Sequence, residues 1–333
     1  MREILIADPI ANSAVAALQS LPADVTFRPD LTARQLAGAM SDVSILIVRS
    51  TSVDEAAIDA APYLELIVRA GAGINSIDVN AATRKGIYVA NCPGRNAAAV
   101  AELVIGLLLA LDRRIVEATN DLRNGRWNKR SYAYGMGLAG NKFGILGLGA
   151  TGQAVARAAR GLGMEVIAWS KSLTPQTAVR YGIGFCATPG ELARCADVVS
   201  IHLAADASTY HLIDRRFLSQ MRDGAYLINT SRGEIVDTVA LKEAIHRKSL
   251  RVALDVFEDE PAQDGPYFAD LDLAQMIVAT PHLAASTRQA MEAISREVVR
   301  VIGAYIGNGV PLNVINAPAS KSAVAADVSF DFV

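Results

Sequence analysis

A glycine-rich turn near the middle of the chain constrains its fold more than any other feature. The turn Gly147-Leu148-Gly149-Ala150-Thr151-Gly152 follows the short apolar run 142–146 and precedes the Ala-rich segment 153–162. An apolar strand, a G-x-G-x-x-G turn and a helix, in this order, are typical of a dinucleotide-binding βα unit. A strand-to-helix turn that binds nothing is the alternative, so the pattern needs support from the rest of the chain.

Each position of this turn has its own physical reason. Gly147 permits the tight turn, Gly149 lets the backbone approach a pyrophosphate, and Gly152 lets the helix pack closely on the strand. Ala150 and Thr151 lie between the glycines where the helix begins, and there free backbone N–H groups and the positive end of the helix dipole favour phosphate. We therefore assign all five residues to a dinucleotide cofactor site.

The composition is that of a folded, two-domain chain. The length of 333 residues predicts two domains, and 51% hydrophobic with 20% charged residues excludes a disordered chain. The net charge is -2 and no dense Lys/Arg patch is present, so we expect no nucleic-acid partner. The most apolar stretch, 97–111, carries Glu102 and is too short to span a bilayer, so we expect no membrane association.

The cysteines and the N-terminal residues bear on the cellular compartment. Cys92, Cys186 and Cys195 form no C-x-x-C pair and no metal-ligand spacing, which predicts no metal site and a reducing compartment. Residues 1–8 lack the long apolar stretch of a signal peptide. These observations predict a cytoplasmic protein.

Apolar strands alternate with helices from residue 1 to residue 90. Strands are expected at 4–7, 44–48, 64–68 and 87–90, and helices at 13–21, 32–40, 55–60 and 79–85. Near-continuous apolar strands separated by helices predict a parallel α/β sheet. This part contains no G-x-G-x-x-G turn, so the dinucleotide site belongs to another part of the chain.

A second α/β unit begins near Asn141. Strands are expected at 143–146, 165–169, 197–201, 225–229, 252–256 and 276–279, and helices at 151–162, 189–195 and 238–247. A helix at 97–114 and a polar segment at 120–134 precede this unit, and a helix at 286–305 would return the chain to the first unit. The predicted fold class is therefore α/β, with two doubly wound parallel-sheet domains.

The returning helix makes the outer domain discontinuous. We expect a substrate-binding, flavodoxin-like domain at 1–98 plus 288–333 and a dinucleotide-binding Rossmann domain at 99–287. The tail 317–333 is small, polar and unpatterned, and is expected to be loosely held.

Three reactive side chains follow strands of the second unit. Arg232 follows the strand 225–229, Glu260 follows 252–256, and His282 follows 276–279. In open parallel sheets, ligands bind beyond the carboxyl ends of the strands. If these strands are neighbours, the three side chains meet in one cleft.

The three residue types suit one reaction. Arg presents a planar fork to a carboxylate, and His gives or takes a proton near neutral pH. Glu beside His fixes the imidazole and raises its proton affinity. With a dinucleotide, Arg232, Glu260 and His282 fit hydride transfer between a nicotinamide and a 2-oxo or 2-hydroxy acid.

Each of these residues also has a structural interpretation. Arg232 could form a loop salt bridge, Glu260 a solvated acidic turn, and His282 a buried structural histidine. His202 also ends a strand and competes for the acid/base role, with Asp206 as the one acidic candidate to pair with it.

The other two histidines are weaker candidates for the acid/base role. His246 lies in a polar helical stretch and is expected at the surface. His211 lies in a short segment, and no neighbouring residue in the sequence can be identified as its partner.

Several linked motifs resemble one enzyme family. The glycine turn at 147–152, Asn229-Thr230-Ser231-Arg232-Gly233, the run 255–261 and Thr280-Pro281-His282 have the order and spacing of the D-isomer-specific 2-hydroxyacid dehydrogenases. The runs 48–51 and 69–78 resemble the D-3-phosphoglycerate dehydrogenase branch. The resemblance extends from about residue 3 to about residue 316.

The resemblance implies a role for each matched residue. Arg232 would bind the substrate carboxylate and polarise C2=O, and Glu260 would pair with His282, the acid/base. Asp255 would hold the nicotinamide carboxamide, and backbone at Ala72-Gly73 would bind the carboxylate. The matched residues that complete the implied cofactor site are His202 and Thr230. The family architecture is two Rossmann-like domains and a homodimer joined through the helix near Glu102.

Two departures from the family pattern are present, and the first bears on the cofactor. The acidic residue expected at the end of the second strand, which would hold the ribose 2′-OH, is missing, and Ser170-Lys171 stand there instead. These residues predict that the 2′-phosphate of NADP(H) is tolerated or preferred, so the cofactor is NAD(H) or NADP(H). Ala204 replaces a proline common in the family.

The substrate is a small 2-hydroxy or 2-oxo acid, with 3-phosphoglycerate the leading candidate. Arg49, in the run 48–51, would bind a distal phosphate or would only anchor its loop. Glyoxylate/hydroxypyruvate reduction is the alternative reaction. A non-catalytic dinucleotide-sensing regulator is the alternative class of protein.

Overall fold

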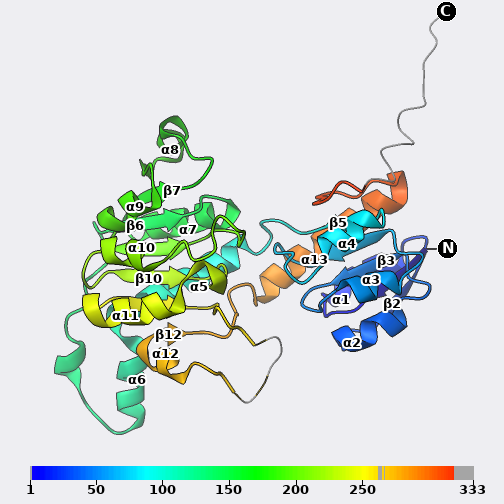
Figure 1. Cartoon of the computed structure of the whole chain (residues 1–333). Helices are drawn as coiled ribbons and strands as arrows, with labels where there is room; N and C mark the ends of the chain where they lie inside the picture. Colours follow the sequence, from blue (N-terminus) through cyan, green and yellow to red (C-terminus); the bar gives the residue numbers. More distant parts are fainter. Residues whose placement is uncertain (1, 262–264, 266, 319–333) are drawn as a thin grey trace, which may run out of the picture. The chain divides into compact units, whose positions relative to one another are not determined.

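The structure is a computed structural model that describes residues 2–261, 265 and 267–318. The chain forms two units, which are drawn in Figure 1 and described separately below. Unit 1 comprises Met1–Asn96 and Thr287–Val333, and unit 2 comprises Ala97–Ser286. Residues 319–333, most of the tail predicted to be loosely held, lie outside the described residues.

Unit 1 is built on a five-stranded parallel sheet with the order β2-β1-β3-β4-β5. The strands are β1 (Arg2–Ile6), β2 (Ala23–Phe27), β3 (Ile45–Val48), β4 (Leu66–Arg69) and β5 (Tyr88–Ala90). The helices are α1 (Asn12–Gln19), α2 (Ala33–Leu36), α3 (Glu55–Asp59), α4 (Val79–Arg84) and α13 (Arg288–Asn308).

The strands of unit 1 bury side chains on both faces of the sheet. Leu5, Leu46 and Ile67 lie in the core that α2, α3 and α4 cover. The neighbouring residues Ile4 and Ile45 lie in the opposite core, with α1 and α13. Each fully buried Ile or Leu stabilises the fold by roughly 2 kcal/mol, so this alternation holds both helical layers in place.

Unit 2 contains a seven-stranded parallel sheet with the order β12-β11-β10-β9-β6-β7-β8. The strands are β6 (Lys142–Leu146), β7 (Glu165–Trp169), β8 (Gly184–Phe185), β9 (Val198–Ile201), β10 (Tyr226–Asn229), β11 (Arg251–Leu254) and β12 (Val278–Ala279). The helices are α5 (Ala97–Arg113), α6 (Ile115–Arg123), α7 (Ala150–Gly161), α8 (Pro175–Tyr181), α9 (Pro189–Cys195), α10 (Arg215–Gln220), α11 (Thr238–Lys248) and α12 (Leu271–Met276).

Helices cover both faces of the unit 2 sheet. Side chains of α5 and α7 pack on one face, and those of α9, α10 and α11 pack on the other. The chain runs outward from β6 to β8 and then returns to place β9 on the other side of β6. Such a reversal leaves a crevice beyond the carboxyl ends of the strands, where ligands bind in doubly wound folds. The predicted fold class is confirmed in both units.

The main differences from the predicted elements lie at sheet edges and in short helices. The edge strands β2 and β8 were not predicted, because most of their residues are partly or fully exposed and their sequences lack an apolar run. The predicted helix 32–40 is α2 followed by a 3₁₀ turn at Ala37–Ala39. The predicted strand 276–279 is shorter, because α12 extends to Met276.

Four helices of unit 2 also went unpredicted. They are α6, α8, α10 and α12, each with no more than nine residues. No helix among the described residues has the length and apolar character needed to cross a membrane.

Candidate active site

Arg232, Glu260 and His282 follow three strands that are neighbours in the sheet of unit 2. Arg232 follows β10, Glu260 follows β11 and His282 follows β12, and these strands are adjacent in the order β12-β11-β10. Because all strands are parallel, their carboxyl ends lie on one edge of the sheet. The same edge carries the glycine-rich turn that follows β6.

His282 and Glu260 form a close pair. Nδ1 of His282 lies 2.5 Å from Oε1 of Glu260. Their side chains are 46% and 35% exposed, so a small molecule can reach the imidazole. Since Nδ1 is engaged by the carboxylate, Nε2 is the nitrogen left to exchange a proton with a ligand.

The backbone at His282 adopts an uncommon conformation. Its φ is 53°, in the left-handed region that non-glycine residues rarely occupy. Its N–H donates to the carbonyl of Asp255 at 2.8 Å. Strained backbone of this kind persists where the surroundings fix it, and it concentrates at functional sites.

Asp255 fixes the loop that carries His282. Its carboxylate is fully buried and accepts hydrogen bonds from the hydroxyl of Thr280 at 2.6 Å and from the N–H groups of Leu283 at 2.7 Å and Ala284 at 2.9 Å. Both oxygens of Asp255 are therefore used inside the protein. The geometry makes Asp255 a support for the loop 280–284.

A network around Asn229 sets the backbone of Arg232. The side-chain amide of Asn229 donates to the carbonyl of Arg232 at 2.8 Å, and its oxygen accepts from the N–H of Ser231 at 3.0 Å. At the next residue, Gly233, an added Cβ would lie 1.9 Å from the carbonyl oxygen of Phe257, so only glycine fits. Among the described residues, no carboxylate forms an ion pair with Arg232, whose guanidinium remains able to bind an anion.

The glycine-rich turn has the shape that a pyrophosphate requires. Gly147 has a φ of 95°, and an added Cβ would lie 2.4 Å from the carbonyl oxygen of His202. At Gly152 an added Cβ would lie 2.1 Å from the carbonyl oxygen of Gly147. Gly149, in contrast, faces open space, with nothing within 4 Å of such a Cβ. The turn is closed toward the protein and open at the start of α7, which fits a dinucleotide phosphate there.

His202 and Thr230 lie at the ends of β9 and β10 with polar atoms that remain unbonded. Nε2 of His202 lies 2.8 Å from the hydroxyl of Ser200, whereas its Nδ1 is buried without a hydrogen-bond partner among the described residues. Burial lowers the pKa of His202 to about 3, so the ring is neutral at physiological pH. The hydroxyl of Thr230 is likewise buried and has no partner in the described part of the chain.

Asp206 does not pair with His202. Its carboxylate lies 3.2 Å from Nζ of Lys171. The possible pairing of His202 with Asp206 is therefore wrong. Ser170, beside Lys171, directly follows β7 and is partly exposed.

His211 has a partner, contrary to the expectation from the sequence. Its Nε2 lies 2.5 Å from Oε1 of Glu258, and its ring stacks on Tyr210 with centroids 4.0 Å apart. A separation of 47 residues hides this pair from any local pattern. His246 is exposed, as predicted.

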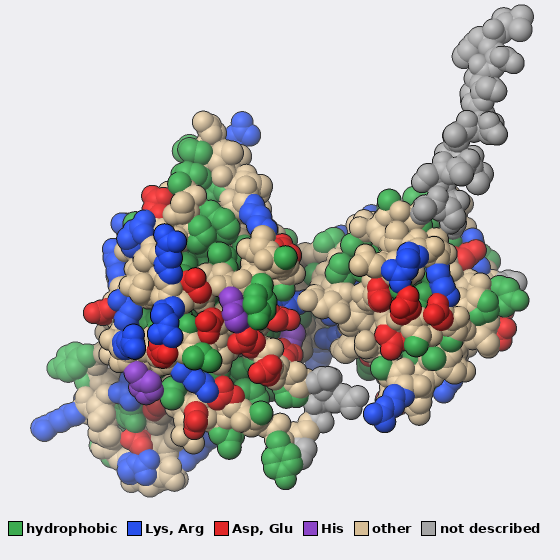
Figure 2. Space-filling model, viewed as in Figure 1, with side chains coloured by type: hydrophobic (Ala, Val, Ile, Leu, Met, Phe, Trp, Pro, Cys, Tyr) green, Lys and Arg blue, Asp and Glu red, His purple; other side chains and the backbone are tan. Residues whose placement is uncertain are grey.

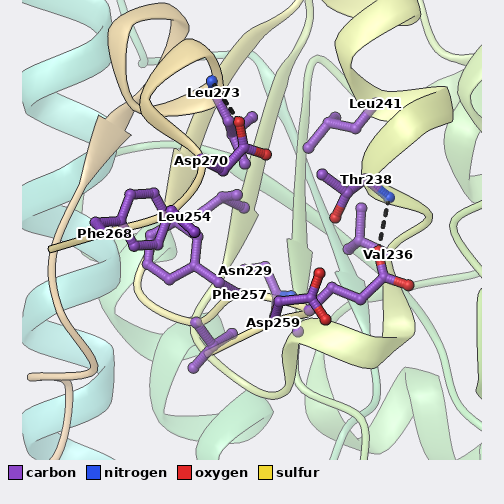
Figure 3. A pocket seen from close by; sticks show the side chains of 14 residues that line it. Asn229, Val236, Thr238, Leu241, Leu254, Phe257, Asp259, Phe268, Asp270 and Leu273 are labelled. Atoms are coloured by element: carbon purple, nitrogen blue, oxygen red, sulfur yellow. Dashed lines mark hydrogen bonds between the residues drawn. The ribbon is translucent and has the colours of Figure 1, made fainter. Parts of the chain in front are cut away.

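A cavity of about 190 Å³ lies near Glu260 in unit 2. Figure 3 shows Phe257 and Phe268 on one wall, with Val236 and Leu241 across from them. The two Phe rings meet edge to face, with centroids 4.7 Å apart. Asp259, the residue before Glu260, also lines this mostly apolar space.

Unit 1 holds Arg49, Ala72 and Gly73, three of the residues predicted to bind substrate. The N–H groups of Ala72 and Gly73 donate no hydrogen bond within the described residues and remain available to an anion. The loop of Arg49 is anchored by the buried Asp8, which accepts from the N–H groups of Arg49 at 2.6 Å and Thr51 at 3.0 Å. The Arg49 guanidinium contacts Met291 and, in the described part of the chain, has no carboxylate partner.

Neither the surface charge nor a cluster of metal-binding side chains points to a further ligand in the described part of the chain. On the face drawn in Figure 2, Lys and Arg side chains are interspersed with Asp and Glu. Within residues 2–261, 265 and 267–318, no three His, Cys, Asp or Glu side chains gather as they would around a metal ion.

Comparison with known proteins matches this geometry. Residues 105–284 match the family model described as the D-isomer specific 2-hydroxyacid dehydrogenase, NAD binding domain. The chain is 36% identical to a D-3-phosphoglycerate dehydrogenase of Methanocaldococcus jannaschii over 96% of its length and 60% of the relative's. It is 37% identical to a hydroxypyruvate reductase of Thermotoga maritima, over 90% of this chain and 97% of that one. The chain thus spans about three fifths of the phosphoglycerate dehydrogenase that it matches.

Solved structures agree with these relatives. The TT0316 protein of Thermus thermophilus superposes with a TM-score of 0.83 at 31% identity, over 94% of this chain and 100% of that one. A 3-phosphoglycerate dehydrogenase of Entamoeba histolytica with bound NAD+ gives a TM-score of 0.79 at 25% identity, over 95% and 99% of the two chains. An NADPH-dependent glyoxylate/hydroxypyruvate reductase of Sinorhizobium meliloti, in complex with NADP, gives a TM-score of 0.78 at 28% identity. The match covers 94% of this chain and 96% of that one. With the G-x-G-x-x-G turn and the Arg232, Glu260 and His282 set in one sheet, these matches show that the chain belongs to the D-isomer specific 2-hydroxyacid dehydrogenase family.

Proposed function

We propose that the chain is an NAD(P)-dependent oxidoreductase that interconverts a small D-2-hydroxy acid and its 2-oxo acid. The observation that carries this proposal is the His282–Glu260 pair, at 2.5 Å. It lies on the sheet edge that also bears Arg232 and the glycine-rich turn. A proton donor, a carboxylate-binding cation and a dinucleotide turn on one edge supply the parts that hydride transfer needs.

The protein's own groups have distinct tasks in this reaction. Arg232 binds the substrate carboxylate with its planar guanidinium and draws electron density from C2=O. Nε2 of His282 gives a proton to the oxygen on C2 during reduction and takes it back during oxidation. Glu260 accepts from Nδ1 of His282 and so fixes the orientation of the imidazole. The chemistry that a nicotinamide would supply when bound is the gain or loss of the hydride at C2.

The turn 147–152 and the residues after β7, β9 and β10 would hold the cofactor. Ala150 and Thr151 open α7 and offer N–H groups to the pyrophosphate, while Gly149 leaves room for it. The buried, unpaired Nδ1 of His202 and hydroxyl of Thr230 support contact with a bound molecule, because such atoms rarely stay unsatisfied.

Substitution of His282 tests the catalytic assignment. In His282→Ala the turnover of 2-oxo acids should fall by about 100-fold or more, because the proton donor is lost. Binding of NADH, measured by its fluorescence, should stay nearly unchanged. His246→Ala is the matched control, since His246 is exposed on α11. Full turnover in His282→Ala would contradict the assignment.

We propose 3-phosphoglycerate as the leading substrate, with hydroxypyruvate or glyoxylate as the alternative. The unpaired guanidinium of Arg49 supports a distal phosphate, and the D-3-phosphoglycerate dehydrogenase relatives favour it. The hydroxypyruvate reductase match, which covers nearly all of both chains, favours the alternative. The two substrates are distinguished by measuring kcat/KM for phosphorylated and plain hydroxypyruvate in wild type and in Arg49→Ala. If Arg49 binds the distal phosphate, kcat/KM should fall in the variant for the phosphorylated acid only.

The proposed compartment is the cytoplasm. Cys92, Cys186 and Cys195 are all unpaired, and burial raises the pKa of the Cys92 thiol to about 12. Three free thiols are usual in a reducing compartment.

A further inference from the structure

One ion pair beside the glycine-rich turn is unexplained by the sequence pattern. Lys171 follows β7, and its Nζ lies 3.2 Å from Oδ2 of Asp206, which follows β9. The hydroxyl of Ser208 contacts the same Nζ at 2.5 Å. Because β6 lies between β7 and β9 in the sheet, the pair joins the loops on either side of the strand that carries the turn.

The end of the strand after the glycine-rich turn is where dinucleotide-binding folds bind the ribose next to the adenine. An acidic side chain at the end of the second strand binds the 2′-OH there and repels a 2′-phosphate. In this chain the end of that strand, β7, carries Ser170 and Lys171. The structure brings a carboxylate to the same place from a different strand, through Asp206.

Asp206 is held firmly despite its exposure. Its Oδ1 accepts from the N–H of Ser208 at 2.7 Å, and its own N–H donates to the hydroxyl of the buried Thr209 at 2.8 Å. Hydrogen bonds from Ser208 and the neighbouring Lys171 lower the pKa of Asp206 to about 2. Asp206 is therefore negatively charged at any physiological pH. Asp206 lines a shallow surface pocket, and a second carboxylate, that of Glu234, lines the same pocket.

We propose that Asp206 is the residue that selects NAD(H) over NADP(H) in this chain, by holding Lys171 and placing its own charge beside the ribose; this inference rests on the proposed function. A 2′-phosphate carries about −1.5 to −2 charges, so it would have to displace Asp206 from Lys171 and then lie close to a carboxylate. A 2′-OH meets no such penalty and donates to the carboxylate. This inference is the opposite of the preference that Ser170-Lys171 alone predicts.

Two substitutions distinguish the effect of the Asp206 carboxylate on nucleotide affinity from that of the Lys171 ammonium. Asp206→Asn keeps the Oδ1 that accepts from Ser208 but removes the charge, which frees Lys171 for a phosphate. The ratio of NADPH affinity to NADH affinity should rise by about 5- to 10-fold in this variant. In the double variant Asp206→Asn/Lys171→Met most of that rise should disappear. Both side chains are about half exposed, so the rise should shrink at high salt.

Direct binding is the appropriate measurement. Calorimetric titration with NADH and NADPH, and with 5′-AMP and 2′,5′-ADP, compares ligands that differ only by the 2′-phosphate. Asp223→Asn is the matched control: Asp223 also pairs with a lysine, Lys248, at 2.6 Å, but it precedes β10 and lies at the opposite edge of the sheet. Its affinity ratio should equal that of the wild type.

The outcomes are distinct. A raised ratio in Asp206→Asn alone, lost with Lys171→Met, supports the inference. An unchanged ratio in Asp206→Asn, with both nucleotides still bound, overturns the inference and leaves the proposed function intact. Failure of the wild type to bind any of the four nucleotides overturns the proposed cofactor site, and the inference with it.

Discussion

At the residue scale, Asp255 controls where His282 lies. Its buried carboxylate holds Thr280, Leu283 and Ala284, and its carbonyl holds the N–H of His282. Asp255→Asn replaces an acceptor by a donor at the Ala284 N–H, so the loop should shift and kcat should fall by about 10-fold or more. NADH affinity, measured by titration, should change little. A large loss of NADH affinity with kcat preserved would instead favour the contact with the nicotinamide carboxamide that the family resemblance implies.

At the element scale, the segment that begins with α6 presents apolar side chains to solvent. It carries exposed apolar side chains, with Trp127 84% and Tyr134 96% exposed and Leu122 58% exposed. Such side chains in one segment mark an interaction surface, and we propose a homodimer. Light scattering should give about twice the chain mass of 35.2 kDa, and a Trp127→Ser/Leu122→Ser variant should shift toward the monomer. Val239→Ser, at a 67% exposed position on α11, is the control. A wild type that is monomeric at micromolar concentration would contradict the dimer.

The strength of each sequence signal decided which elements could be predicted. The strands β3 and β10 are buried along their whole length, and their sequences, ILIV and YLIN, are mainly apolar. The edge strand β2 is half exposed, and its sequence, ADVTF, has no apolar run. The short helix α10 is fixed by its Asp214 cap and by the packing of Phe217 and Leu218, which only the folded sheet supplies.

At the scale of the whole molecule, chain topology explains why the site was predictable in part. Parallel strands place every following loop on one edge, so Arg232, Glu260 and His282 could be grouped from strand ends alone. The pairs Lys171–Asp206 and His211–Glu258 join loops that are 35 and 47 residues apart, and no spacing rule links them. The carboxylate that pairs with Lys171 comes from another loop, so Ser170-Lys171 alone could not predict it.

The central claim is that this molecule moves a hydride between a nicotinamide and C2 of a 2-oxo acid while His282 moves the proton. The most direct test uses NADH or NADPH carrying deuterium at C4, mixed with the protein and hydroxypyruvate, phosphohydroxypyruvate or glyoxylate. Mass spectrometry and chiral chromatography then locate the label and the configuration of the product. We predict deuterium at C2 of the product with each acid that turns over, and a D-2-hydroxy acid wherever C2 is chiral. Binding of the nucleotides without any transfer of deuterium to C2 would contradict the account.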